Sequence, residues 1–327
     1  MRERLMEVLA EPGSGLPLRL EVSRGSGDRI EAGRLVAEPS GSAFPIVNGI
    51  PRFVQAESTY ADSFGLQWNL FRSVQLDSAT NASHSQKRFD AEAGWGAGEM
   101  NGRWVLDAGC GAGRFAEVAA RRGANLVALD FSAAVDATAQ TLAGLTNVDV
   151  VQGDVLNPPF RPGTFDFAYS IGVVQHTPDP ARALASVVRC VRVDGSFCFT
   201  IYARRPWTLL NGKYLIRPVT RIMPKATLLR AIEQAMPVLF PLTDRLFRMP
   251  VLGRVAQFVI PVATYVGRSE LNDEQRYREA ILDTFDMLSP RYDSPMTADE
   301  VGRVLRDVGA RDWSFRTRVP INVVGRR

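Results

Sequence analysis

The sequence predicts an α/β fold built on a mostly parallel sheet, and two patterns support this. A short apolar run at 104–108 leads into a turn with glycine at every second position, followed by a helical pattern at 113–122. Further apolar runs alternate with helical patterns, at 125–130, 148–155, 165–170 and 196–202. Strands that are apolar along their whole length and separated by helices are typical of a parallel sheet covered on both faces.

The glycine turn is the strongest motif in the chain. Gly109, Gly111 and Gly113 follow Asp107, and a strand, a glycine-rich turn and a helix N-terminus together form a crevice for a nucleotide cofactor. Counted from Gly111, the looser dinucleotide pattern G-x-G-x-x-A is also met, with Ala116 in the last position. A carboxylate at the end of the first strand is unfavourable beside a pyrophosphate but suits a cationic ligand. The turn therefore favours a cationic cofactor over a dinucleotide.

Together with Asp130 and Asp154, which end the next two strands, this stretch resembles motif I of the class I S-adenosylmethionine (SAM)-dependent methyltransferases, specifically those of type 11 and of ubiquinone biosynthesis. The resemblance is strong over 103–203 and extends to 295–327 by topology. It implies a Rossmann-like sheet of seven strands in the order 3-2-1-4-5-7-6, with the seventh strand antiparallel.

The resemblance also implies a role for each cofactor residue. Asp107 faces the ammonium and sulfonium end of SAM, Asp130 accepts from the two ribose hydroxyls, and Phe131 lies against adenine. Asp154 accepts from the adenine amine beside Val155, although a turn-capping role is the alternative for Asp154. The complete predicted cofactor set is Asp107, Gly109, Gly111, Gly113, Asp130, Phe131, Asp154, Val155, Ser170 and Gln175.

Candidate catalytic residues come from two segments. The segment 171–180 resembles the motif IV region of the family and contains His176, one of only two histidines in the chain. His176 is predicted as a general base, with a structural role as the alternative. Asp286 and Tyr292 are predicted to hold or deprotonate a substrate, and a local ion pair of Asp286 with Arg291 is the alternative interpretation.

The order of these patterns divides the chain into five parts. They are a small β-rich unit at 1–55, a helical lid at 56–102, the SAM-binding core at 103–203, a helical substrate-selecting insertion after the fifth strand at 204–294, and a C-terminal helix and strands at 295–327 that complete the core.

The first two parts carry weaker signals. Residues 44–54 resemble the end of small zinc-ribbon-like modules, but without Cys-x-x-Cys pairs the unit is predicted to bind no metal. It is expected to be either a docking element or a structural appendage. In the lid, Ser85 is predicted to cap a helix toward Trp95. Phe64, Trp68 and Arg88 are expected to cover the substrate or to pack in the core.

The insertion differs from the rest of the chain in charge. Residues 204–268 contain eleven basic and two acidic residues, a net charge of +9, whereas the whole chain has a net charge of +4. Six prolines are expected to break the insertion into short helices: Pro218, Pro224, Pro237, Pro241, Pro250 and Pro261. Apolar and basic helices suit a hydrophobic or anionic substrate, or a peripheral contact with a membrane through 204–268. A solvated helix face or the interface of a homodimer is the alternative.

Composition narrows the setting and the partners. The three cysteines lack paired spacing, which argues against disulfides and against a zinc site, and favours a cytoplasmic protein. No signal peptide and no membrane span are recognisable. Nucleic acid is not expected as a partner, because the aromatic and basic residues do not form a stacking platform.

The sequence therefore predicts an enzyme that transfers a methyl group from SAM to a small-molecule acceptor and leaves S-adenosylhomocysteine. Two alternatives remain at this point: an NAD(P)-dependent oxidoreductase that uses the G-x-G-x-x-A turn, and a non-catalytic SAM-binding protein.

Overall fold

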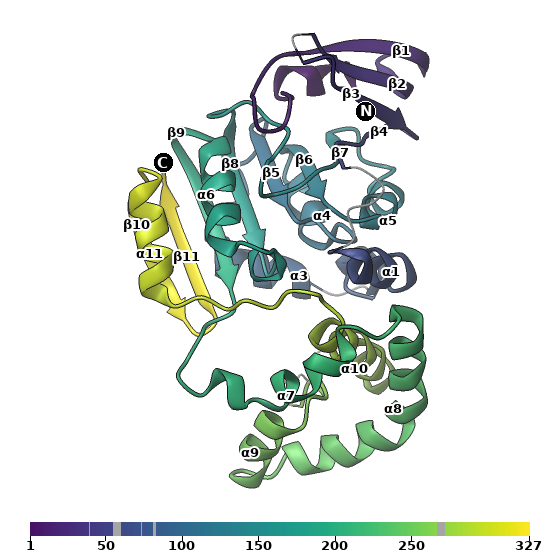
Figure 1. Cartoon of the computed structure of the whole chain (residues 1–327), viewed down its shortest axis with the longest axis vertical. Helices are drawn as coiled ribbons and strands as arrows, with labels where there is room; N and C mark the ends of the chain where they lie inside the picture. Colours follow the sequence, from purple (N-terminus) through teal and green to yellow (C-terminus); the bar gives the residue numbers. More distant parts are fainter. Residues whose placement is uncertain (39, 55–59, 73, 81–82, 267–271) are drawn as a thin grey trace.

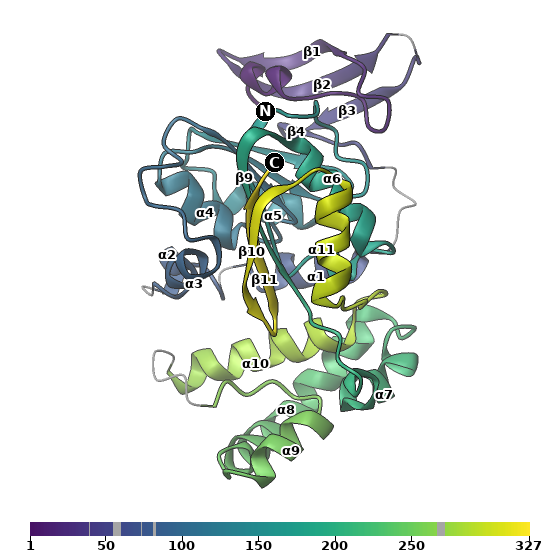
Figure 2. The same cartoon turned by 90° about the vertical axis from the view of Figure 1, so that its left-hand side faces the viewer.

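The computed structural model describes residues 1–38, 40–54, 60–72, 74–80, 83–266 and 272–327. Within them the chain forms a four-stranded antiparallel sheet and a seven-stranded mixed sheet. Figures 1 and 2 show the small sheet at one end of the molecule, the large sheet in the middle and the helical insertion at the other end.

The large sheet has the strand order β7-β6-β5-β8-β9-β11-β10. Its strands are β5 (Trp104–Ala108), β6 (Asn125–Asp130), β7 (Val148–Gln152), β8 (Phe165–Ile171), β9 (Val191–Ile201), β10 (Arg311–Arg318) and β11 (Ile321–Arg326). Numbered within this sheet alone, the order is 3-2-1-4-5-7-6. β11 runs antiparallel to both of its neighbours, and the other pairs are parallel. The predicted α/β fold class is confirmed.

Helices cover both faces of this sheet. One face packs against α6 (Pro180–Cys190) and α11 (Ala298–Asp307). The other packs against α3 (His84–Ala93), α4 (Arg114–Arg121) and α5 (Ala134–Thr141). The sequence pattern Thr297-x-x-Glu300 predicts a capping box, and these two residues form it at the start of α11.

Two predicted helix ends were wrong. The sequence pattern predicts a helix from Ala181 to Arg192, opened by Pro180, but this helix ends at Cys190, because β9 already begins at Val191 and pairs with Phe165 of β8. Ser85 does not cap α3 but lies buried inside it. The carboxylate of Asp77, in the short helix α2 (Asp77–Thr80), accepts instead from the amide nitrogens of Ser85 and Gln86, both at 2.9 Å.

The small sheet packs directly on the large one. It contains β1 (Leu18–Ser26), β2 (Arg29–Ala37), β3 (Ala43–Val47) and β4 (Ile50–Pro51), preceded by the 3₁₀ helix η1 (Glu3–Glu7). Leu5, Leu9 and Leu35 are fully buried in the same hydrophobic cluster as Leu129 and Val151 of the large sheet. The two sheets therefore share one core.

The insertion forms η3 (Thr208–Leu210), α7 (Gly212–Thr220), α8 (Lys225–Phe247), α9 (Leu252–Val259) and α10 (Asp273–Leu288). The expected break at every proline was wrong: Pro218 lies inside α7, and Pro237 and Pro241 lie inside the 23-residue helix α8. Pro237 and Pro241 are on the exposed side of α8, where water can bind the carbonyls that have lost an N–H partner.

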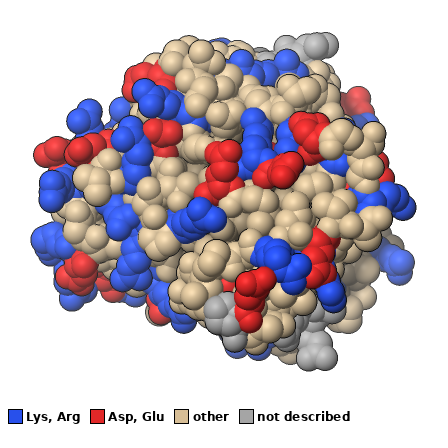
Figure 3. Space-filling view, turned by 90° about the horizontal axis from the view of Figure 1, so that it is seen from above, with Lys and Arg blue, Asp and Glu red and all other residues tan. Residues whose placement is uncertain are grey.

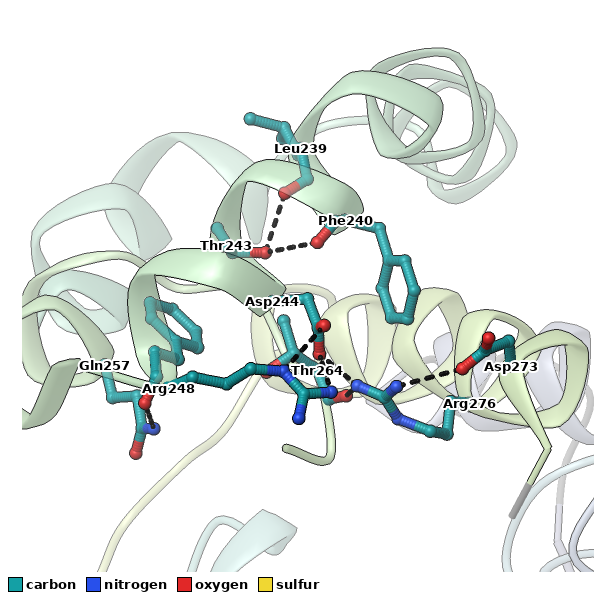
Figure 4. Close-up of polar contacts among 10 residues, drawn as sticks. Leu239, Phe240, Thr243, Asp244, Arg248, Gln257, Thr264, Asp273 and Arg276 are labelled. Carbon is teal, nitrogen blue, oxygen red and sulfur yellow. Dashed lines mark hydrogen bonds and ion pairs between the residues drawn. The ribbon is translucent and has the colours of Figure 1, made fainter. Parts of the chain in front are cut away.

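A small hydrophobic core and a polar network hold the insertion together. Ile232 and Met236 of α8 pack against Ile281 and Phe285 of α10. Figure 4 shows Asp244 of α8 between two arginines, Arg248 of the same helix and Arg276 of α10. Arg276 also contacts Asp273 and the carbonyl of Thr264.

Candidate active site

The glycine turn between β5 and α4 approaches its neighbours too closely for any side chain. Gly109 has φ of +95°, and an added Cβ would lie 2.3 Å from Val173. Gly111 has φ of +54°, and its Cβ would lie 3.0 Å from the indole of Trp68. The turn is fixed by the amide nitrogens of Gly109 and Cys110, which donate to the carbonyl of Leu129 at 2.7 and 2.9 Å. Glycine is therefore required by space as well as by backbone conformation.

Asp130, at the end of β6, faces this turn. One carboxylate oxygen accepts from the amide of Gly111 at 3.0 Å, and the other accepts from the amide and hydroxyl of Ser132 at 2.9 and 2.7 Å. Burial raises the pKa of Asp130, and these hydrogen bonds oppose the rise. The carboxylate is thus held in one orientation beside the glycine turn.

Phe131 and Asp154 are both in contact with Tyr60. The two rings stack with centroids 4.2 Å apart and planes 17° apart. The Tyr60 hydroxyl donates to Asp154 at 2.9 Å. Tyr60 therefore makes both contacts that the sequence analysis assigned to adenine. Val155 lines a cavity that the glycine turn and Asp130 also line.

Six predicted residues do not line this cavity: Asp107, Gly113, Asp154, Ser170, Gln175 and Tyr292. Asp107 is buried between β5 and β8, and burial raises its pKa to about 8 against the effect of the neighbouring Tyr169 hydroxyl. The Ser170 hydroxyl donates to the carbonyl of Ala108 at 2.7 Å, which ties β8 to β5. Gln175 is fully buried, and its backbone carbonyl accepts from the amide of Ser294 at 2.8 Å.

His176 projects from the 3₁₀ turn η2 (Val174–His176) into the cavity. Its Nδ1 lies 3.1 Å from the backbone carbonyl of Tyr292. A carbonyl only accepts, so this contact places the proton of a neutral ring on Nδ1 and leaves the lone pair on Nε2. The rings of Phe64 and Tyr202 flank the imidazole, with centroids 5.2 and 5.5 Å away.

Asp286 of α10 lies on the same side of the cavity. Burial raises its pKa, and the charge of His176 acts in the opposite direction. It accepts a hydrogen bond of 3.3 Å from Gln67, in the helix α1 (Asp62–Leu70), whereas no ion pair with Arg291 is seen among the described residues. Gln67 is fully buried, and its side-chain oxygen has no protein partner in the described part of the chain.

The cavity also contains a cluster of charged groups, of which only Arg88 was expected from the sequence. Arg88 and Arg114 come from α3 and α4, and Glu279 and Asp283 come from α10. Arg114 donates to two neutral acceptors, Ser85 and Gln75, both at 3.0 Å. Burial raises the pKa of Asp283 to about 7, and the nearby arginines oppose the rise. The two acidic residues could have been found from helical spacing, since Glu279 and Asp283 fall on the same helix face as the predicted Asp286.

These groups line one cavity of about 510 Å³. It extends from the glycine turn, past His176, to Gln257, Pro261 and Ala263 of the insertion. No group of three or more His, Cys, Asp or Glu side chains suited to a metal ion occurs within the described ranges.

Comparison with known proteins finds similarity to methyltransferases over part of the chain. Residues 106–199 match the family model described as a methyltransferase domain. The chain is 31% identical over 137 residues to the ubiquinone biosynthesis O-methyltransferase of Alkalilimnicola ehrlichii, covering 40% of this chain and 54% of that protein. It is 32% identical over 132 residues to the enzyme of the same name from Sodalis glossinidius, covering 38% and 53%. The chain thus spans about half the length of the curated relatives it matches.

Among solved structures, human N-acetylserotonin methyltransferase in complex with SAM aligns with a TM-score of 0.45 at 14% identity, covering 84% of this chain and 60% of that one. The segment that matches the family model, 106–199, contains the glycine turn, Asp130 and His176. The resemblance predicted from the motifs is confirmed over residues 106–199, which match the model of a methyltransferase domain.

Proposed function

We propose that this chain transfers a methyl group from SAM to a hydroxyl of a small, largely apolar molecule. The observation that carries the proposal is that one cavity, at the strand ends of the segment that matches the methyltransferase model, is lined by the glycine turn, Asp130 and His176. In parallel sheets, ligands bind at the carboxyl ends of the strands.

The residues present suit SAM. The glycine turn leaves a cradle that a Cβ would fill, and Asp130 is oriented to accept from ribose hydroxyls. The cluster of charged groups in the cavity suits the amino-acid part of the cofactor, with Arg88 and Arg114 for its carboxylate and Glu279 and Asp283 for its ammonium. Adenine binding at Phe131 and Asp154 requires Tyr60 to move aside or to share these contacts.

SAM supplies a methyl group already activated on a sulfonium, so the protein has mainly to position the acceptor and to remove its proton. His176 presents Nε2 to the cavity and can take the proton of a hydroxyl. The Tyr292 carbonyl holds the ring in that orientation, and Asp286 stabilises the imidazolium that forms. Phe64 and Tyr202 keep water away from the imidazole.

The relatives named as O-methyltransferases favour a hydroxyl acceptor. The part of the cavity formed by the insertion contains Pro261, Ala263 and Met287, and Phe64 of α1 lines the same cavity, which favours an apolar acceptor.

We also propose that the insertion contacts a membrane surface. Of 19 large apolar residues that are exposed in the described part of the chain, 14 lie between 207 and 259. The most exposed are Leu209, Ile222 and Val251, at 73%, 78% and 77%. An apolar surface with added basic charge suits an anionic bilayer. At the opposite end of the molecule, Figure 3 shows basic and acidic side chains intermixed. No helix among the described residues is long and apolar enough to cross a membrane.

Thermal unfolding with SAM, S-adenosylhomocysteine, NADH or NADPH added singly tests the cofactor. A ligand at 100 times its Kd adds about 2.7 kcal/mol to stability. We expect a shift with the two adenosyl compounds only. A shift with a nicotinamide cofactor, or with none of the four, would contradict the proposal.

Sedimentation with phosphatidylcholine vesicles, with and without phosphatidylglycerol, tests the membrane contact. We expect binding to the anionic vesicles that is lost when Leu209, Ile222 and Val251 are changed together to Ser. Val22→Ser, at a residue of the small sheet that is 54% exposed, serves as the control. If the wild type does not bind and is instead a dimer that the triple variant dissociates, the surface is a homodimer interface.

A further inference from the structure

One residue of the N-terminal unit, Arg52, links this unit to the strand ends beside the proposed cofactor site. Immediately after β4, Arg52 pairs with Gln152 at the end of β7 in a parallel bridge. The amide of Phe53 donates to the carbonyl of Gln152 at 2.8 Å. Figure 1 shows β4 beside β7, at the outer edge of the large sheet.

The side chains continue this contact toward the cavity. Arg52 donates to the side-chain oxygen of Gln152 at 2.8 Å, and the side-chain nitrogen of Gln152 donates to the carbonyl of Phe131 at 3.1 Å. The second terminal nitrogen of Arg52 donates to Asp136, at the start of α5, at 2.7 Å. Arg52 therefore holds both the residue after Asp130 and the helix that follows.

Arg52 also determines how the Gln152 amide is oriented. A guanidinium only donates, so it fixes the amide oxygen toward Arg52 and leaves the NH₂ group for the Phe131 carbonyl. The backbone of the same turn is held by Gly153, whose amide donates to the carbonyl of Asp130 at 2.9 Å. Without Arg52, the amide would be free to turn its oxygen toward the carbonyl and lose that hydrogen bond.

We propose that Arg52 is a positioning residue for the adenosine part of the cofactor site. Through Gln152, the N-terminal unit fixes the turn that carries Asp130 and Phe131, and so sets the affinity for the cofactor. This inference rests on the proposed SAM-dependent function.

The rest of the N-terminal unit is anchored independently of Arg52. Leu9 forms an antiparallel bridge with Phe160, and the amide of Arg161 donates to the carbonyl of Val8 at 2.9 Å. Arg2 and Arg4 both pair with Asp149. A variant at Arg52 should therefore keep the unit docked.

The experiment compares the full-length wild type with Arg52→Met and Gln152→Met. The control is Arg34→Met, which removes an ion pair with Glu21 elsewhere in the same unit. S-adenosylhomocysteine and SAM are titrated by calorimetry. We expect both test variants to weaken binding about tenfold, as for the loss of one hydrogen bond to a charged group, and the control to bind like the wild type. The double variant should lose no more than either single one, and Arg52→Lys should recover part of the affinity.

Amide hydrogen exchange gives a second readout that needs no cofactor. The amides of Gly111, Ser132 and Gly153 should exchange faster in Arg52→Met than in the wild type and in Arg34→Met. If exchange at these amides is unchanged, or if Arg52→Met binds both adenosyl compounds as tightly as a binding wild type, the inference is wrong. A wild type that binds neither adenosyl compound overturns the proposed function and the cofactor role of Arg52 with it, whatever the exchange shows.

Discussion

His176 has its tautomer and orientation set by a single backbone carbonyl, that of Tyr292. That carbonyl belongs to the segment that returns from the insertion to the core. The base and the substrate-selecting part of the chain are therefore mechanically linked, because any displacement of the insertion near Tyr292 also changes the direction of the imidazole.

Replacing His176 with Ala should lower kcat by about 10²–10⁴-fold, the usual contribution of a general base. The Kd for SAM should not change, because His176 is not among the residues assigned to the cofactor. Single-turnover kinetics and calorimetry measure the two quantities. His84→Ala, at the only other histidine, should leave kcat unchanged. A His176→Ala variant with full turnover would show that this histidine is structural.

Asp283 gives a prediction about pH. Its pKa is raised to about 7 in the folded protein by burial, compared with about 3.9 in an unfolded chain. The folded state binds the extra proton, so the stability due to this group is present below about pH 4 and is lost as the pH rises through about 7. Asp283→Asn removes this dependence.

Relative to the wild type without cofactor, Asp283→Asn should therefore gain about 1–3 kcal/mol in unfolding free energy between pH 5 and pH 8. Urea unfolding at several pH values in this range measures the difference. A constant difference between the two proteins would contradict the raised pKa.

At the scale of elements, the insertion depends on the contact between α8 and α10. Arg276 has an exposed side-chain fraction of 8% and contacts both Asp244, at 18%, and Asp273, at 96%. Asp244→Ala leaves the guanidinium buried without its main partner and should cost about 2–4 kcal/mol. Asp273→Ala removes the exposed partner of the same arginine and should cost less than about 1 kcal/mol. Chemical denaturation monitored by helical circular dichroism distinguishes the two, and equal losses would show that Asp244 has no special role.

The elements of the core were predictable because their signals are local. Fully apolar strands, the glycine turn, and Thr297 with Glu300 each identify an element within a few residues. The failures came from contacts distant in the sequence or from solvent exposure. Ser85 has the sequence position of a helix cap, yet the carboxylate of Asp77 is the group that accepts from the backbone amide at the start of this helix. Pro237 and Pro241 resemble helix breakers, yet exposure on one face of α8 lets the helix continue.

The residues of the candidate site also divide into those with a local sequence signal and those without one. Gly109, Gly111, Asp130 and His176 were found because each follows a strand of the core, and parallel strands end at one edge of a sheet. Arg114, Asp283 and Gln67 were missed because they reach the cavity from helices whose packing the sequence does not specify. Asp107 was expected to face the ligand; its side chain is buried beside Tyr169, and one of its carboxylate oxygens has no partner among the described residues.

At the scale of the whole molecule, the N-terminal unit is part of the main core. Deleting residues 1–55 removes Leu5, Leu9 and Leu35, which are fully buried against Leu129 and Val151 of the sheet. It also uncovers the edge of β7. We expect the truncated chain to be insoluble or unfolded, as judged by soluble yield and circular dichroism. A soluble, cooperatively unfolding truncation would make the unit an appendage.

The order of the large sheet has a consequence for synthesis on the ribosome. β11 lies between β9 and β10, yet it begins 120 positions after the end of β9. At about 5–20 residues per second, the outer edge of β9 has no partner for roughly 6–24 s. The segments made in that interval are the insertion, α11 and β10, and none of them pairs with β9 in the folded sheet. A ribosome that stalls within the insertion would therefore release a chain with an open, apolar sheet edge, the kind of nascent chain that chaperones retain and that aggregates when they are depleted.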